Sequence, residues 1–374
     1  MPPVQWRTCG STAGFRHYLV LGPPKSMLGA LVVAGLALSG SVSRAPQSAV
    51  TRSATSPSFL HAVSKRAGAP RVHMASCARL AEAAAMIDSI DVFIFDCDGV
   101  IWKGDSLING VPEILDMLRK AGKRIFFVTN NSTKSRKGYV GKFTSLGLSV
   151  TPEEIFSSSF AAAAYMEQIK FKATGKKVYV VGEVGIEEEL DLIGVPHIGG
   201  PSDADQKIEL KNGGMVHHDP DVGAVIVGFD RYINYYKIQY AQLCINENPG
   251  CLFIATNLDA VTHLTDAQEW AGNGAMVGAI KGCTKQEPIL VGKPSPLMID
   301  YIVDKYKIAS RDRICMVGDR LDTDILFGRD NGLRTCLTLS GVTTEAKLLS
   351  ADNKIAPDFY VGSIAEFKSV SVAV

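Results

Sequence analysis

Short apolar runs alternate with helical stretches along the chain from Ile90 onward. The runs are rich in β-branched and aromatic residues and are apolar on both faces, which is the pattern of strands in a parallel sheet covered by helices on each side. Beyond the first 80 residues we find no repeat of the kind that predicts a solenoid. The pattern therefore predicts an α/β fold. The predicted strands are 91–95, 123–128, 177–181, 224–228, 252–255, 289–291, 313–317 and 333–339.

The first 80 residues differ in composition from the rest of the chain. They carry nine Lys and Arg, no Asp or Glu, and many Ser, Thr and Ala, which is typical of an organelle transit peptide. We expect residues 1–75 to be such a leader, directing the protein to the chloroplast stroma, with the mitochondrion as an alternative and a secretory signal as the runner-up. Their apolar stretch, 27–38, is too short to span a bilayer, so we expect no membrane association.

The charge of the remaining residues limits the kind of partner. Residues 81–374 carry 30 basic and 38 acidic side chains, so a broad basic surface is not expected and nucleic acid is not a predicted partner. The eight cysteines include no CxxC pair. We therefore expect buried thiols in a reducing compartment rather than a zinc site or a disulfide framework.

Polar clusters follow four of the predicted strands. They are 96–100 (DCDGV), 129–132 (TNNS), 292–294 (GKP) and 318–324 (GDRLDTD). Each cluster alone is more often a turn or a helix cap. Because ligands bind beyond the carboxyl ends of the strands in open parallel sheets, we expect the four clusters to converge on one site. Helices are expected to begin near Ser132 and at Ser295 and Pro296.

In this order the clusters resemble the motifs of the haloacid dehalogenase superfamily of aspartate-nucleophile phosphatases. The longer strings DCDGVIW, VTNNS and VGKPS resemble the subfamily with a large cap inserted between the second and third motifs. The resemblance implies a Rossmann-like parallel-sheet core, residues 76–174 and 285–374, with an inserted α/β cap domain, residues 175–284. It also implies a phosphatase for a small-molecule phosphate monoester, and a homodimer, because caps of this subfamily often mediate dimers.

The resemblance implies catalytic roles for the first and fourth clusters. Asp96 would be the nucleophile that forms an aspartyl-phosphate, and Asp98 would be the general acid and base. A Mg²⁺ cofactor would be held by the carboxylates of Asp96 and Asp319 and by the backbone carbonyl of Asp98. Asp324 would fix a metal-bound water or the lysine of the third cluster.

The second and third clusters would bind the phosphate group. Thr129 and Asn130 would offer a hydroxyl and backbone amides to the phosphate oxygens. Lys293 would neutralise the negative charge of these oxygens and of the nearby carboxylates.

The inserted cap is expected to select the substrate through segments 255–262 and 272–278. The strings at 227–241 and 264–270 resemble plant and algal phosphoglycolate phosphatases, so 2-phosphoglycolate, a photorespiratory metabolite, is the expected substrate. Arg231, His263 and Lys281 are candidate partners for its carboxylate. Two alternatives stay open: a phosphatase for pyridoxal phosphate or a broad set of small metabolites, and a non-catalytic protein that binds phospho-ligands.

Overall fold

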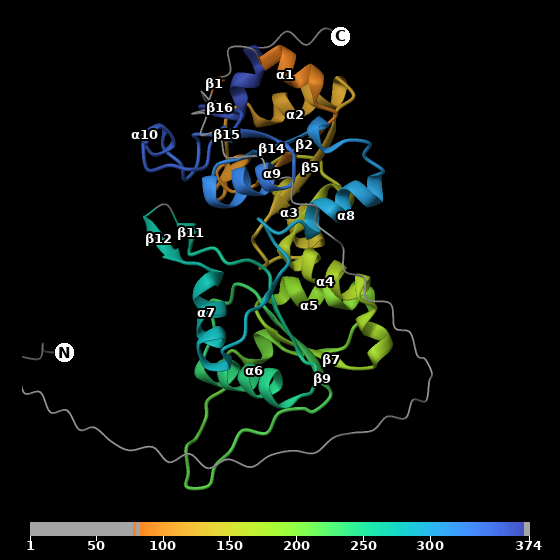
Figure 1. Ribbon diagram of the computed structural model, residues 1–374, viewed down its shortest axis with the longest axis vertical. Helices are drawn as coiled ribbons and strands as arrows, with labels where there is room; N and C mark the ends of the chain where they lie inside the picture. Colours follow the sequence, from red (N-terminus) through yellow and green to blue (C-terminus); the bar gives the residue numbers. More distant parts are fainter. Residues whose placement is uncertain (1–77, 80–82, 266, 370–374) are drawn as a thin grey trace, which may run out of the picture. The chain divides into compact units, whose positions relative to one another are not determined.

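The computed structural model describes residues 78–79, 83–265 and 267–369, so the expected leader, 1–75, lies outside the described residues. Within these ranges the chain forms two parallel sheets with helices packed against them (Figure 1). The predicted α/β class is therefore confirmed. None of the helices in these ranges has the length and apolar character needed to cross a membrane.

The first sheet contains seven strands in the order β1-β16-β15-β14-β2-β5-β6, and every neighbouring pair is parallel. Strands as short as β6 and β16 were not predicted, because runs of three residues carry too little pattern. The strands are β1 (Ala78–Arg79), β2 (Val92–Phe95), β5 (Arg124–Thr129), β6 (Ile155–Ser157), β14 (Ile314–Gly318), β15 (Arg334–Thr338) and β16 (Phe359–Val361).

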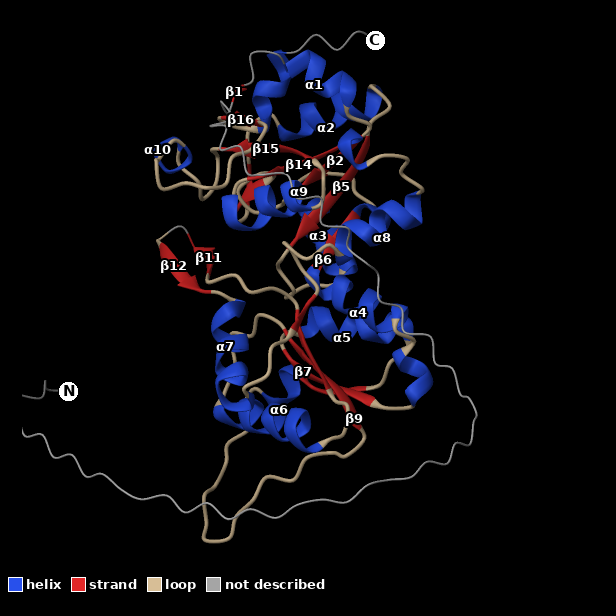
Figure 2. Cartoon of the chain, in the orientation of Figure 1, coloured by secondary structure: helices blue, strands red, loops and turns tan. Residues whose placement is uncertain are grey.

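Helices cover both faces of this sheet, as Figure 2 shows. Alternate strand residues face opposite sides, so the sheet has two apolar clusters, one packed against α1 (Ala83–Ser89), α2 (Val111–Lys120) and α3 (Arg136–Ser145), the other against α4 (Ser158–Gln168), α8 (Leu297–Tyr306) and α9 (Leu326–Asp330). A short helix, α10 (Glu345–Leu348), follows β15.

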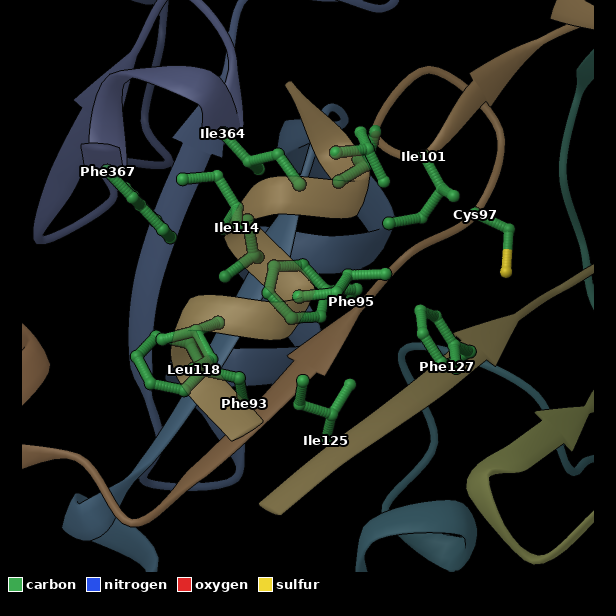
Figure 3. Packing of buried hydrophobic residues seen from close by; sticks show 14 of the residues in the cluster. Phe93, Phe95, Cys97, Ile101, Ile114, Leu118, Ile125, Phe127, Ile364 and Phe367 are labelled. Carbon is green, nitrogen blue, oxygen red and sulfur yellow. The ribbon is translucent and has the colours of Figure 1, made fainter. Parts of the chain in front are cut away.

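The first of these clusters is rich in aromatic side chains (Figure 3). Phe93 and Phe95 stack with their ring centroids 6.0 Å apart, and Phe95 lies 6.3 Å from Phe127. Burial of each such ring stabilises the fold by about 1.5–3 kcal/mol. Cys97 continues this apolar row, so Asp96 between Phe95 and Cys97 faces the other way.

The second sheet contains five parallel strands in the order β13-β10-β9-β7-β8. It packs on α5 (Val184–Ile193) on one face and on α6 (Tyr235–Glu247) and α7 (Asn273–Thr284) on the other. Its strands are β7 (Lys177–Val181), β8 (His197–Gly199), β9 (Val222–Val227), β10 (Leu252–Ala255) and β13 (Ile289–Leu290).

Two small antiparallel hairpins complete the fold. One, β3 (Trp102–Lys103) with β4 (Ser106–Leu107), follows the first polar cluster, and the other, β11 (Val261–Thr265) with β12 (Gln268–Ala271), follows β10. The thiols of Cys97, Cys244 and Cys315 are free and buried, as expected, whereas that of Cys283 is exposed.

A single apolar cluster joins the two sheets through α4 and α5. It contains Phe160 of α4, Ile186 and Leu190 of α5, and buried residues from strands of both sheets. Beside it, the buried carboxylate of Glu189 in α5 pairs with Arg136 at the start of α3, with Nη2 and Oε2 2.8 Å apart. The two sheets therefore share one of their apolar clusters.

Candidate active site

Three of the predicted clusters meet because their strands are neighbours in the first sheet. Asp96 follows β2, Asp319 follows β14 and Thr129 ends β5, and β2 lies between the other two strands. One carboxylate oxygen each of Asp96, Asp319 and Asp324 lies within 4.8 Å of the others. The structure thus brings together the acidic residues that the sequence placed at strand ends.

Lys293 reaches the same point by another route. We expected it to follow a strand of the same sheet, but the preceding strand, β13, pairs with β10 of the second sheet. Its Nζ donates hydrogen bonds to Asp96 Oδ1 and Asp324 Oδ1, each at 2.6 Å, and to the carbonyl oxygen of Val128 at 2.9 Å. The lysine is 2% exposed, so its charge is fully committed to this cluster.

The cluster contains more negative than positive charge. Burial alone would lower the pKa of Lys293, but Asp324 and Asp96 raise it, so the ammonium stays protonated. Burial raises the pKa of Asp96 against the opposing effect of Lys293. Burial, followed by the charge of Asp324, raises the pKa of Asp319 to about 7. Three buried carboxylates facing one ammonium form an oxygen donor set that fits a hard divalent cation such as Mg²⁺.

Asp319 is held by a close approach of the backbone. The N–H of Val342 donates to its Oδ2 at 2.6 Å. Gly99 has φ of +84°, and a Cβ added there would lie 2.5 Å from Asp319 Oδ2. Only glycine tolerates both this conformation and this approach, which explains the glycine that follows Asp98.

Asp324 orients both the lysine and the end of β14. Its Oδ1 accepts from Lys293, and its Oδ2 accepts the backbone N–H groups of Asp319 and Arg320 at 3.2 and 3.1 Å. Asp324 is 1% exposed. Contact with the lysine is one of the two roles expected for it.

Asp98 has a partner that we did not predict. The exposed carboxylate of Asp98 accepts a hydrogen bond from Trp102 Nε1 at 2.8 Å. Trp102 is fully buried and packs edge-on against Phe143, with ring centroids 4.9 Å apart, while Lys142 Nζ lies 4.5 Å from its ring. Trp102 is the last residue of the string DCDGVIW, so the residue itself was visible in the sequence. Its contact with Asp98 could not be predicted, because it depends on the turn that leads into the β3–β4 hairpin.

The side chain of Asn130 is fully used within the protein. Its Oδ1 accepts the N–H of Lys293 at 2.8 Å, and its Nδ2 donates to the carbonyl oxygen of Lys293 and to Asp259 Oδ1, both at 3.1 Å. Only its backbone amide is left to approach a phosphate. Thr129 is buried and lines the cavity described below.

Two predicted helix starts are wrong. The helix expected near Ser132 begins at Arg136, with Ser135 as the N-cap that accepts the N–H of Gly138 at 3.2 Å. Ser132 Oγ instead accepts the N–H of Phe229 from the second sheet at 3.1 Å. Helix α8 has Pro296 rather than Ser295 at its N-cap.

A cavity of about 270 Å³ opens at this cluster. It is lined by all seven predicted residues: Asp96, Asp98, Thr129, Asn130, Lys293, Asp319 and Asp324. The opposite wall includes Asn257, Asp259 and Asn273, which lie in the two segments expected to face the substrate, together with Leu264 of β11.

The three candidate partners for a second anion have different surroundings. Arg231 lines the cavity, but its Nε and Nη2 donate to Glu183 at 2.8 and 2.7 Å. Lys281 pairs with Glu287 at 2.7 Å and is not a lining residue. The side chain of His263 is outside what the structure describes. Lys134, which we did not predict, also lines the cavity.

A Rossmann-like parallel sheet with carboxylates at its carboxyl edge and a buried lysine beside them can hold a divalent cation and an anionic group such as a phosphate. Sequence models of haloacid dehalogenase-like hydrolases match residues 93–196 and, under the description HAD-hydrolase-like, residues 290–367. The chain belongs to the haloacid dehalogenase-like hydrolases, and it is a phosphatase.

Individual relatives support this assignment. The chain is 64% identical to Phosphoglycolate phosphatase 1A, chloroplastic, of Arabidopsis thaliana over 79% of its own length and 81% of the relative. The solved p-nitrophenyl phosphatase from Archaeoglobus fulgidus is 30% identical with a TM-score of 0.63, covering 75% of this chain and 99% of that one. A glycerol phosphate phosphatase from Mycobacterium tuberculosis in complex with magnesium is 25% identical with a TM-score of 0.61, covering 75% and 77%.

Proposed function

We propose that the protein hydrolyses 2-phosphoglycolate to glycolate and inorganic phosphate through an aspartyl-phosphate on Asp96. The observation that carries the chemistry is Lys293 Nζ at 2.6 Å from Asp96 Oδ1, in the wall of the cavity. The 64% identity to a relative named as a phosphoglycolate phosphatase supports the substrate.

In the first step, an oxygen of Asp96 attacks phosphorus as the bond from phosphorus to the leaving alkoxide breaks. Asp98 donates a proton to that alkoxide. A carboxylate and a phosphate dianion repel each other, and the ammonium of Lys293 offsets this repulsion. The hydroxyl of Thr129 and the backbone amide of Asn130 bind phosphate oxygens.

In the second step, water attacks phosphorus of the aspartyl-phosphate and Asp98 accepts its proton. The bond between phosphorus and Asp96 breaks, which releases inorganic phosphate and restores the carboxylate. Asp98 suits both steps, because it lines the cavity and one of its oxygens is fixed by Trp102.

The carboxylates of Asp96 and Asp319 and the backbone carbonyl of Asp98 would hold Mg²⁺. When bound, this ion neutralises negative charge on the phosphate and on the carboxylates. The excess of buried carboxylates and the relative solved in complex with magnesium support this assignment. In this assignment, Asp324 accepts a hydrogen bond from Lys293 and is not a metal ligand.

The covalent mechanism is tested by Asp96→Asn. We expect kcat to fall on the order of 10⁴-fold, because an amide cannot act as the nucleophile. Asp91→Asn is the matched control, since Asp91 is exposed and precedes the same strand at its opposite end. Retained turnover in Asp96→Asn, with the control at wild-type activity, would remove the aspartyl-phosphate from the mechanism.

The substrate is tested by comparing kcat/KM for 2-phosphoglycolate, glycerol 3-phosphate and pyridoxal 5′-phosphate. We expect 2-phosphoglycolate to be preferred at least about tenfold. Glycerol phosphate is the second candidate, because Asn273 lines the cavity and its buried Oδ1 accepts no hydrogen bond from the described residues. A leaving-group hydroxyl would supply the missing donor. A preference for glycerol 3-phosphate would therefore replace the first assignment.

We further propose residues 76–174 and 285–374 as the core and 175–284 as the cap. Strand β13, although it lies within the core range, adds a strand to the sheet of the cap.

Residues 1–75 would direct the protein to the chloroplast stroma, consistent with the name of the Arabidopsis relative. Fusing these residues to a fluorescent reporter tests the location, with mitochondrial signal as the contrary result. A homodimer is proposed and is tested by light scattering during gel filtration.

A further inference from the structure

The amide of Asn130 holds the main chain of Lys293 on both sides. Its Oδ1 accepts the N–H of Lys293 at 2.8 Å and its Nδ2 donates to the carbonyl oxygen of the same residue at 3.1 Å. Both contacts are buried, and Asn130 is 7% exposed. With its backbone held at both polar groups and its Nζ held by three hydrogen bonds, this lysine has little freedom to shift its ammonium.

Asn130 is itself held by the β10–β11 loop, residues 256–260. Asn257 Nδ2 donates to the carbonyl oxygen of Asn130 at 2.7 Å, and Asp259 Oδ1 accepts from Asn130 Nδ2 at 3.1 Å. Within the loop, Asn257 Oδ1 accepts the backbone N–H of Asp259 at 3.0 Å, which fixes the side chain of Asn257 to the main chain of Asp259. The loop therefore reaches Lys293 through a single intervening residue.

The backbone beside Lys293 is packed directly against this loop. Val291 N–H donates to the carbonyl oxygen of Ala255 at 3.1 Å, which continues the pairing of β13 with β10. A Cβ added at Gly292 would lie 2.1 Å from the carbonyl oxygen of Thr256 and 2.8 Å from Asn130 Oδ1. The absence of a side chain at Gly292 is what permits the close fit.

We propose that Asn130 is a positioning residue that couples the β10–β11 loop to Lys293. The inference rests on the role of Lys293 in the proposed function. Asn257 and Asp259 of the loop also line the cavity. A substrate that contacts the loop therefore also influences the position of the Lys293 ammonium, which neutralises its phosphate. The coupling passes through hydrogen bonds, so it depends on which atom donates at each contact.

The test exchanges donor and acceptor across the contact between Asn130 and Asp259. Asn130→Asp places two carboxylates against each other and removes the donor to the Lys293 carbonyl. We expect kcat to fall about 100-fold and inhibition by inorganic phosphate to weaken about tenfold. Adding Asp259→Asn gives the facing residue an amide that can donate, and we expect this double variant to recover about tenfold of the lost kcat.

The controls separate coupling from general damage. Asp259→Asn alone keeps an acceptor oxygen and should lower kcat only a few-fold. Asn246→Asp makes the same chemical change on the exposed side of α6 and should leave activity unchanged. The inference is overturned if Asn130→Asp has wild-type kcat, or if the double variant recovers nothing.

A second comparison applies if Asn130→Asp does not fold. Asp259→Ala removes the acceptor for Asn130 Nδ2, so it should lower kcat and weaken phosphate inhibition several-fold more than Asp259→Asn. Equal values for the two variants would reject the coupling. If Asp96→Asn loses turnover and the double variant Asn130→Asp with Asp259→Asn recovers no activity, only the coupling is rejected. If Asp96→Asn retains turnover, the proposed function is rejected.

Discussion

In the proposed mechanism, the hydrogen bond from Trp102 to Asp98 decides which oxygen of that carboxylate is available for proton transfer. The indole is fixed by its burial and by its contact with Phe143, so it presents one N–H in one direction. With Oδ1 accepting this bond, the other oxygen is the one that can carry the transferable proton. The bond orients the acid without taking part in the proton transfer.

Replacing Trp102 by Phe should therefore affect substrates according to their leaving group. We expect kcat for an alkyl phosphate to fall about 10- to 100-fold, because a poor leaving group needs the proton. For p-nitrophenyl phosphate, whose leaving group is stable as an anion, the loss should be smaller, about threefold. Trp270→Phe removes an indole donor from a contact with Thr265 in the β11–β12 hairpin and serves as the control. Equal losses for both substrates would contradict the orienting role.

At the scale of elements, α3 and α5 are joined by a buried ion pair. The backbone N–H of Arg136 donates to Glu189 Oε1 at 2.6 Å, and its guanidinium donates to both carboxylate oxygens while lying 4.0 Å from the ring centroid of Phe160. Glu189 is fully buried, whereas the side chain of Arg136 is 21% exposed. Removal of Arg136 and removal of Glu189 should therefore have different effects on stability.

Arg136→Ala should destabilise the protein more than Glu189→Ala. The first leaves a buried carboxylate without its cation, which costs about 3–5 kcal/mol, while the second leaves a guanidinium that can reach water and costs less. Arg119→Ala, which breaks a half-exposed pair with Glu154, should cost under about 1 kcal/mol. Urea unfolding of the three variants measures the free energies. A larger loss of stability in Glu189→Ala than in Arg136→Ala would show that the carboxylate of Glu189 becomes hydrated when Arg136 is removed.

How far the sequence predicted the elements depended on how local their signals are. The meeting of Asp96 with Asp319 followed from apolar runs on neighbouring parallel strands, a pattern visible in the sequence. The placement of β13 in the second sheet could not be predicted, because a strand of two residues, Ile289 and Leu290, does not show which strand it will pair with. The use of the Asn130 side chain was missed for the same reason, since its partners lie 129 and 163 positions away.

At the scale of the whole molecule, the buried acidic cluster links stability to pH and to metal. The pKa of Asp319 is raised by burial from a reference value of 3.8 to about 7 in the folded protein. The folded state then binds more protons than the unfolded state between these values, so the free energy of unfolding falls as pH rises from about 4 to 7. The raised pKa of Asp96 acts in the same direction.

Metal-free protein should therefore lose a few kcal/mol of stability between about pH 4 and pH 7. At the proposed site, Mg²⁺ would bind the ionised carboxylates of the folded state, so it should restore stability more at pH 7 than at pH 4. Asp319→Asn should flatten both dependences. Thermal unfolding with and without a chelator checks this, and a metal-free protein that gains stability over this range would contradict the assignment.

The apolar cluster that runs through α4 and α5 has a consequence for dividing the chain. Each sheet needs the other to complete the cluster on one of its faces, so a fragment that contains either sheet alone would expose that face to water. Neither half of the chain is therefore suited to expression on its own.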